Sequence, residues 1–242
     1  MRNVDTPIWM PANPAPLAIG AVDIWRVRLD AAFNETLLNQ DEQVRAERFV
    51  FQRDARRYAA GRAHLRTLIG AYLDEAPEAL RFVTGQWGKP ALAGPDRHIA
   101  FNLSHSGDIA LIAVGRVADL GVDIEMIQPI KDRDAVAAQN FAANEMIELE
   151  ALPADLQESA FFACWTRKEA IIKLWGEGFS ADLASFNVSL DPRLPARVIS
   201  ITRPQMRAED IKLYSFKPAN GFLAALATWD VKDLQLNFRT PC

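Results

Sequence analysis

An α+β fold is expected for this 242-residue chain, because helical segments and antiparallel-looking strands occur together in both of its halves. The first half combines a strand near 22–27 with a long helical region at 34–73. The second half opens with helices and closes with short strands. Half of the residues are hydrophobic and 24% are charged, which is typical of a globular protein with ample material for a core.

The helical region of the first half is predicted from apolar residues at helical spacings, among them Tyr58 and Leu65. Asp41 is expected to be the N-cap of a second helix within this region. Gly61 or Gly70 is expected to break or end a helix, because glycine is a poor residue for a helix interior.

A turn and three strands are expected next. The turn is T-G-Q-W-G-K-P at 84–90. The runs 98–104 and 108–114 are predicted to form a hairpin across Ser106-Gly107, and a third strand follows at 121–125.

Three helices are predicted in the second half, near 133–140, 143–151 and 154–175, and Gly176 is expected to be the C-cap of the last one. The closing strands are expected near 185–190, 197–202, 211–216 and 222–229.

Charge and composition exclude several classes of function. A net charge of -4 argues against broad nonspecific binding to nucleic acid. Two cysteines, Cys164 and Cys242, form neither a disulfide framework nor a zinc motif. The N-terminus lacks the apolar region of a signal peptide, and the longest uncharged apolar run, Ile109–Gly115, is far shorter than the roughly 20 residues of a membrane span. We therefore expect a cytoplasmic protein with no membrane or nucleic-acid partner.

The motif G-V-D-I-E at 121–125 places two carboxylates one residue apart. Val122 and Ile124 alternate with Asp123 and Glu125, which is the period of a strand, so both carboxylates are expected on one face. Like charges this close raise one pKa or attract a cation. The alternative is an exposed edge strand with a solvated acidic face.

The motif W-T-R-K-E-A-I-I-K at 165–173 adds a third carboxylate. Glu169 and Lys173 are four residues apart and share one face of a helix, which an ordinary surface ion pair would also explain. Together with Asp123 and Glu125, however, Glu169 completes a set of hard oxygen ligands that suits Mg²⁺. Lys173 could face phosphates bound to the same ion, so the set indicates phosphoryl transfer or phosphoester chemistry.

The motif F-N-L-S-H-S-G at 101–107 places His105 between two serines. A Ser-His hydrolase is a weak interpretation, because no G-x-S-x-G elbow accompanies the motif. Contact of Ser104 and His105 with phosphate fits a magnesium site better, and the alternative is a histidine with no role in chemistry.

Arginines are concentrated between 41 and 66, and Lys89 lies in the turn that follows. Guanidinium groups match phosphate geometry, so these residues are candidates for an anion site, and the alternative is a solvated helix with ion pairs. The arginines are Arg45, Arg48, Arg53, Arg56, Arg57, Arg62 and Arg66.

In their order and spacing, F-N-L-S-H-S, G-V-D-I-E and W-T-R-K-E-A-I-I-K resemble the surfactin-synthetase-type (Sfp-type) 4'-phosphopantetheinyl transferases. The W-G-K-P turn, the R-F…D-A-R-R segment before it and the G-x-G-F-S segment at 176–180 fit the same pattern. The resemblance runs from about residue 42 to 190.

The resemblance implies a monomeric pseudo-dimer of two similar subdomains, 1–117 and 118–242, with coenzyme A bound in the cleft between them. It implies transfer of the phosphopantetheine arm of coenzyme A to a serine of an apo acyl, peptidyl or aryl carrier protein, with release of adenosine 3',5'-bisphosphate. Such enzymes serve fatty acid, polyketide and nonribosomal peptide biosynthesis.

The resemblance also implies roles for individual residues. Asp123, Glu125 and Glu169 would hold Mg²⁺, and Lys173 would contact the pyrophosphate. The chemistry of such a transfer also needs a base for the serine proton, and a carboxylate or a metal-bound water could serve. Glu169 is the first candidate and Glu125 the second. The coenzyme-binding residues would be Arg45, Arg57, Lys89, Ser104, His105, Lys168 and Lys173.

Two other functions are considered. A magnesium-dependent phosphodiesterase acting on nucleotides would use the same carboxylates, but it leaves the S-H-S and W-G-K-P motifs unexplained. A non-catalytic carrier-binding protein would be expected to lack a metal ligand or Lys173, and all are present.

Overall fold

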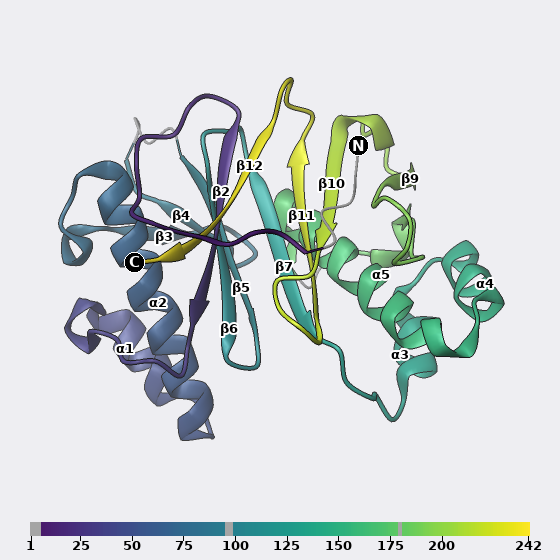
Figure 1. Ribbon diagram of the computed structural model, residues 1–242, viewed down its shortest axis with the longest axis horizontal. Helices are drawn as coiled ribbons and strands as arrows, with labels where there is room; N and C mark the ends of the chain where they lie inside the picture. The colour runs from purple at the N-terminus through teal and green to yellow at the C-terminus, as the bar shows by residue number, and fades with distance from the viewer. Residues whose placement is uncertain (1–5, 95–98, 179–180) are drawn as a thin grey trace.

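The computed structural model describes residues 6–94, 99–178 and 181–242. Its layers run from helix α2 (Gln52–Leu73) through a large sheet and a small sheet to helix α5 (Ala154–Trp175) (Figure 1). Helices and strands occur in both halves, as expected. His98 of the predicted hairpin and Phe179 and Ser180 of the G-x-G-F-S segment lie outside the described residues.

The large sheet has the strand order β1-β12-β2-β6-β5. The predicted hairpin is confirmed as β5 and β6, which pair antiparallel around a turn in which Gly107 has a φ of 56°. The strands are β1 (Met10–Ala12), β2 (Ala21–Arg28), β5 (Ala100–Ser106), β6 (Ile109–Gly115) and β12 (Gln235–Pro241).

The small sheet has the strand order β10-β11-β7, and all of its pairs are antiparallel. Its strands are β7 (Leu120–Met126), β10 (Ile211–Phe216) and β11 (Phe222–Trp229). The order β7-β11-β10 repeats the order β2-β6-β5 of the large sheet. In the sequence, helices separate β2 from the hairpin of β5 and β6, and helices likewise separate β7 from the hairpin of β10 and β11.

The three predicted helices of the second half are confirmed as α3 (Arg133–Asn140), α4 (Ala143–Ala151) and α5. Gly176 is the C-cap of α5 with a φ of 73°, a left-handed conformation that glycine adopts at little cost. In the described ranges, no helix combines the length and the apolar character needed to cross a membrane.

The remaining short elements connect these layers. They are α1 (Gln40–Glu47), β3 (Phe82–Thr84), β4 (Pro90–Leu92), β8 (Phe186–Val188), β9 (Val198–Ile201) and the 3-10 helices Glu35–Leu37, Pro77–Ala79, Leu183–Ser185 and Ala208–Asp210.

The N-terminal helices differ from the prediction in two ways. Asn39, not Asp41, is the N-cap of α1, because its side chain and that of Glu42 form a reciprocal capping box. Helix α2 also continues through Gly61 and Gly70 without a break. At Gly70 a side chain would lie 2.6 Å from the carbonyl oxygen of Glu75, so this glycine allows the chain to fold back closely after the helix.

The core is divided by the two sheets. Helix α2 covers one face of the large sheet, α5 covers one face of the small sheet, and the other faces pack against each other. Val22 and Ile24 of β2 meet Val122 and Ile124 of β7 in this central layer. The sheets therefore hold β5 and β7 close together, which brings the motifs on these strands into contact.

Strand β12 was not predicted. It follows the small sheet in the sequence but pairs in parallel with β2 of the large sheet (yellow beside purple in Figure 1). Asn237 on β12 donates to Asp23 Oδ1 at 2.8 Å, and Tyr72 on α2 donates to Asp23 Oδ2 at 2.5 Å. The C-terminal strand is thereby tied to the first half of the chain.

Candidate active site

Strand β7 presents Asp123 and Glu125 to helix α5, while Val122 and Ile124 point into the core between the sheets. The two carboxylates were predicted to share a face. The charge of Asp123 contributes to raising the pKa of Glu125, which is consistent with this prediction. Asp123 is 3% exposed, so the alternative of a solvated acidic strand is wrong for this residue.

Gly121 explains why α5 lies so close to this strand. A Cβ atom at Gly121 would be 2.1 Å from the carbonyl oxygen of Ala170 and 2.4 Å from the amide nitrogen of Leu174, both in the backbone of α5. Only a residue without a side chain permits this approach. The contact places the helical turn that carries Glu169 and Lys173 directly across from Asp123.

Lys173 forms its ion pair with the strand instead of with its own helix. Its Nζ lies 2.6 Å from Asp123 Oδ1 and 2.9 Å from Ser104 Oγ. The Ser104 hydroxyl in turn donates to Asp123 Oδ1 at 2.8 Å. Residues from β5, β7 and α5 therefore meet at one carboxylate oxygen.

Glu169 lies in the same electrostatic environment. Burial and the charge of Asp123 raise the pKa of Glu169, and the charge of Lys173 partly opposes this rise. Glu169 also contributes to raising the pKa of Glu125. Glu169 on α5 is far in the sequence from the two carboxylates of β7, yet it lies within electrostatic reach of them across the contact between β7 and α5.

A cation is consistent with this arrangement, although the carboxylates do not converge as a ligand set. Over residues 6–94, 99–178 and 181–242, no group of three or more His, Cys, Asp or Glu side chains is placed so that it could hold a metal ion as it stands. However, Asp123 Oδ2 is buried without a hydrogen-bond partner, which is costly for a carboxylate oxygen. Burial and neighbouring negative charge also raise the pKa of Glu125 to about 7. A cation would relieve both unfavourable features.

Strand β5 contacts β7 through a row of polar side chains. Asn102 Oδ1 accepts a hydrogen bond from the backbone N–H of Val122 at 2.9 Å. Two residues further on, Ser104 bonds to Asp123, and Ser106 Oγ donates to Glu125 Oε2 at 2.8 Å. This row fixes the position of β7 relative to β5 and connects the S-H-S motif to the carboxylates.

His105 points away from this row and is exposed. Partial desolvation lowers the pKa of His105, and the positive charges of Arg57 and Lys173 lower it further. Arg57 is itself held by Asp108, with Nη2 2.8 Å from Oδ1. His105 therefore lies within electrostatic reach of Arg57 and Lys173, and of these two cations only Lys173 contacts Asp123.

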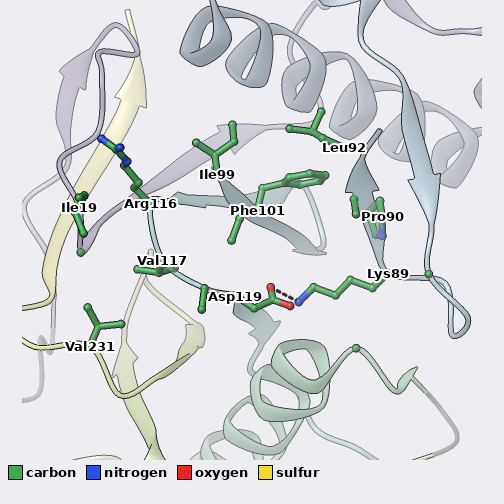
Figure 2. Close-up of a pocket in the computed structure, with 16 residues that line it drawn as sticks. Ile19, Lys89, Pro90, Leu92, Ile99, Phe101, Arg116, Val117, Asp119 and Val231 are labelled. Carbon is green, nitrogen blue, oxygen red and sulfur yellow. Dashed lines mark hydrogen bonds and ion pairs between the residues drawn. The ribbon is translucent and has the colours of Figure 1, made fainter. Parts of the chain in front are cut away.

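Lys89 lies on the border of a cavity of about 850 Å³ (Figure 2). Its Nζ donates to Asp119 Oδ1 at 2.6 Å and to the carbonyl oxygen of Leu120 at 2.9 Å. The cavity is bordered by Phe101 near the start of β5 and by Asp119 just before β7, so it lies toward the opposite ends of these strands from Ser106 and Glu125.

Arg45 is exposed on α1, where its guanidinium lies 5.5 Å from the centre of the Tyr58 ring. It borders a hollow of about 490 Å³ together with Arg48 and Phe49. Arg45 and Lys89 thus line different hollows, and the structure does not bring them together.

The assignment of Lys168 to coenzyme binding requires correction. Its side chain is 0% exposed, and its Nζ lies 2.8 Å from Glu145 Oε2. The same Nζ donates to the carbonyl oxygens of Leu183 and Phe186, each at 2.7 Å. Lys168 points into the core of the second half, so its charge is used in folding and is not available to a ligand.

Three residues of the site were not singled out from the sequence. Asn102 and Ser106 could have been found from the strand alternation, because residues 102, 104 and 106 share one face of β5. No local signal marks Asp119 as the partner of Lys89, because the two residues are 30 positions apart.

The raised pKa of Glu125 predicts a pH dependence of stability. The pKa of Glu125 is about 7 in the folded state, and its ordinary value is 4.5. Between these two pH values, the folded state therefore binds a proton at Glu125 more tightly than the unfolded chain does. The corresponding stabilisation is present at pH 4.5 and is lost as the pH rises through 7. We therefore compare the wild type with Glu125→Gln in metal-free buffer. The free energy of unfolding of the wild type should decrease relative to that of the variant as the pH rises from 4.5 to 7. Urea unfolding at several pH values measures it, and parallel pH profiles for the two proteins would contradict the prediction.

Comparisons with known proteins agree with this geometry. Residues 119–227 match the family described as the 4'-phosphopantetheinyl transferase superfamily, and residues 26–116 match the family described as 4'-phosphopantetheinyl transferase, N-terminal. In the solved "Chronobacterium ammoiniagenes apo-ACPS structure", 92% of the chain aligns with 45% of this one, at 17% identity and a TM-score of 0.34.

Several relatives are similar over most of the chain. The 4'-phosphopantetheinyl transferase HetI of Nostoc sp. is 35% identical over 198 residues, which cover 78% of this chain and 83% of HetI. The transferase psf-1 of Bacillus pumilus is 39% identical over 74% of each chain. Sfp of Bacillus subtilis is 33% identical over 64% of this chain and 67% of its own. The chain therefore belongs to the 4'-phosphopantetheinyl transferase superfamily and is of the Sfp type.

Proposed function

We propose that this protein transfers the 4'-phosphopantetheine arm of coenzyme A to a serine of an apo carrier protein and releases adenosine 3',5'-bisphosphate. The observation that carries the proposal is the contact of Ser104, Asp123 and Lys173, with Glu125 and Glu169 beside it, in a chain whose relatives are named as such transferases. The phosphodiesterase alternative has no support among these relatives.

In the reaction, the carrier serine Oγ forms a bond to the β-phosphorus of coenzyme A. The bond from this phosphorus to the bridging oxygen breaks, and the electron pair leaves with the adenosine bisphosphate. Negative charge therefore grows on the leaving group, and the serine proton must be accepted by a base. These two needs assign roles to residues of the site.

A divalent cation, Mg²⁺ by the chemistry of the donors, would be held by Asp123, Glu125 and Glu169. The unpartnered oxygen of Asp123 and the raised pKa values of the two glutamates support this assignment. When bound, such an ion neutralises charge on the pyrophosphate. Lys173 must then exchange part of its contact with Asp123 for the pyrophosphate.

The general base is assigned to Glu169 first and to Glu125 second. A base works best when its pKa is near the working pH, and both carboxyls have raised pKa values. The pKa of Glu125 is about 7, which is well matched to this task. Both carboxylates would also hold the cation, and this weakens either of them as a base.

The phosphates of coenzyme A are assigned to donors around the same contact. Ser104 contacts Lys173 and Asp123, and His105 lies within electrostatic reach of Lys173 and Arg57. Arg45 and Lys89, each on the border of a separate hollow, are assigned as further phosphate contacts. Lys89 would have to exchange its bond to Asp119 for a phosphate.

We further propose that the protein is a monomeric pseudo-dimer of subdomains 1–117 and 118–242, with the coenzyme between them. The shared strand order β2-β6-β5 and β7-β11-β10 supports this division. Strand β12 would then be the exception, because it follows the second subdomain in sequence and pairs with the first.

The test is incubation of the protein with coenzyme A, Mg²⁺ and a panel of apo acyl and peptidyl carrier proteins, followed by intact-mass analysis. We expect a carrier to gain one phosphopantetheine group. A matched carrier, with its serine replaced by alanine, should gain none. Hydrolysis of coenzyme A without modification of any carrier would contradict the proposal.

A further inference from the structure

The two serines of the S-H-S motif make equivalent contacts with the two carboxylates of β7. Ser104 Oγ donates to Asp123 Oδ1, and Ser106 Oγ donates to Glu125 Oε2, both at 2.8 Å. Asp123 Oδ2 is buried without a partner, and no hydrogen bond joins Glu125 Oε1 to any described residue. Each serine therefore holds one oxygen of a carboxylate and leaves the other available.

The backbone fixes the direction of the Ser106 hydroxyl. Its oxygen accepts a hydrogen bond from the backbone N–H of Met126 at 3.0 Å. This contact uses an acceptor position of Oγ and leaves the hydroxyl proton to be donated to Glu125. Met126 directly follows Glu125 in β7, so Ser106 holds both the backbone and the side chain of this part of the strand.

Such a contact has a defined effect on a charged ligand. A hydrogen bond donated to one oxygen of a carboxylate restricts rotation of the group and so sets the direction of its other oxygen. Partners that orient a metal ligand typically change metal affinity or activity by about 10–100-fold when they are removed.

We propose that Ser106 is a positioning residue that holds Glu125 Oε2 so that Oε1 faces the cation. This inference rests on the proposed function, because it assumes that Glu125 is a ligand of the ion that the reaction uses. Asn102 has a different role, because its side chain accepts a hydrogen bond from the backbone N–H of Val122 and does not contact a carboxylate.

The test uses Ser106→Ala together with the matched pair Ser106→Thr and Ser106→Val. Threonine and valine have nearly the same shape and both suit a strand, so the pair differs mainly in the hydroxyl. Mn²⁺ binding to the full chain, with coenzyme A present, is followed by the EPR signal of the free ion. Transfer to an apo carrier is measured in parallel as a function of Mg²⁺ concentration, and thermal melts show whether each variant is folded.

The expected result is Mn²⁺ binding that is about 10–100-fold weaker in Ser106→Ala and Ser106→Val, with recovery in Ser106→Thr. Asn102→Ala should lower the melting temperature without this loss of affinity. Wild-type Mn²⁺ affinity in the valine variant would overturn the inference, as would equal losses in the threonine and valine variants.

The same measurements distinguish failure of the proposed function from failure of the role of Ser106. If the wild type modifies a carrier but binds no Mn²⁺, the metal assignment and the role of Ser106 are overturned while transfer stands. If it binds Mn²⁺ but modifies no carrier, transfer is overturned, and the threonine–valine comparison still decides the role of Ser106.

Discussion

Replacing Lys173 by alanine is expected to lower kcat by about 10²–10³, while the KM for coenzyme A changes far less. The reason is that Lys173 would offset charge that grows on the departing bisphosphate, and an interaction that strengthens in the transition state appears mainly in kcat. The measurement is steady-state transfer to an apo carrier protein with a thermal melt of the same variant.

Lys212→Ala is the matched control. Lys212 also belongs to an ion pair, 3.1 Å from Asp230 on the small sheet, but it has no contact with the site. Its removal should leave kcat unchanged. Because Asp123 is buried, Lys173→Ala will also lose some stability, so both variants must be assayed well below their melting temperatures. A near-normal kcat for Lys173→Ala would make Lys173 a structural residue.

Replacing Lys168 by alanine is expected to lower the free energy of unfolding by about 3–5 kcal/mol, because one partner of a buried pair is left without compensation. The Glu145 side chain is 1% exposed and would stay in the core without its cation. The carbonyl oxygens of Leu183 and Phe186 would also lose a donor. Urea unfolding measures the change.

The double variant Glu145→Gln/Lys168→Met is the control for this prediction. It removes both charges and retains similar volumes, so it should recover much of the lost stability. The opposite outcome, a Lys168→Ala variant of normal stability that no longer binds coenzyme A, would restore the ligand role that the structure contradicts.

Some elements could be predicted because their signals are local. The limits of α5 were predicted correctly, since a long apolar stripe and a following glycine mark this helix. Strand β12 gave no such signal, because its pairing with β2 spans more than two hundred positions and its side chains are only partly buried. Gly61 and Gly70 were misjudged because helix propensity is a weak guide to where a helix ends. At Gly70, the backbone of Glu75 also leaves no room for a side chain.

For the site, local periodicity was enough to place Asp123 beside Glu125 on one face of a strand and Glu169 beside Lys173 on one face of a helix. The motifs also identified the family. Which partner each charge takes could not be obtained this way. Lys168 and Lys173 lie on the same helix, yet one is buried against Glu145 and the other reaches Asp123. That difference depends on what packs across from each side chain, because charge interactions are set by distance and burial, and these exist only once β5, β7 and α5 have come together.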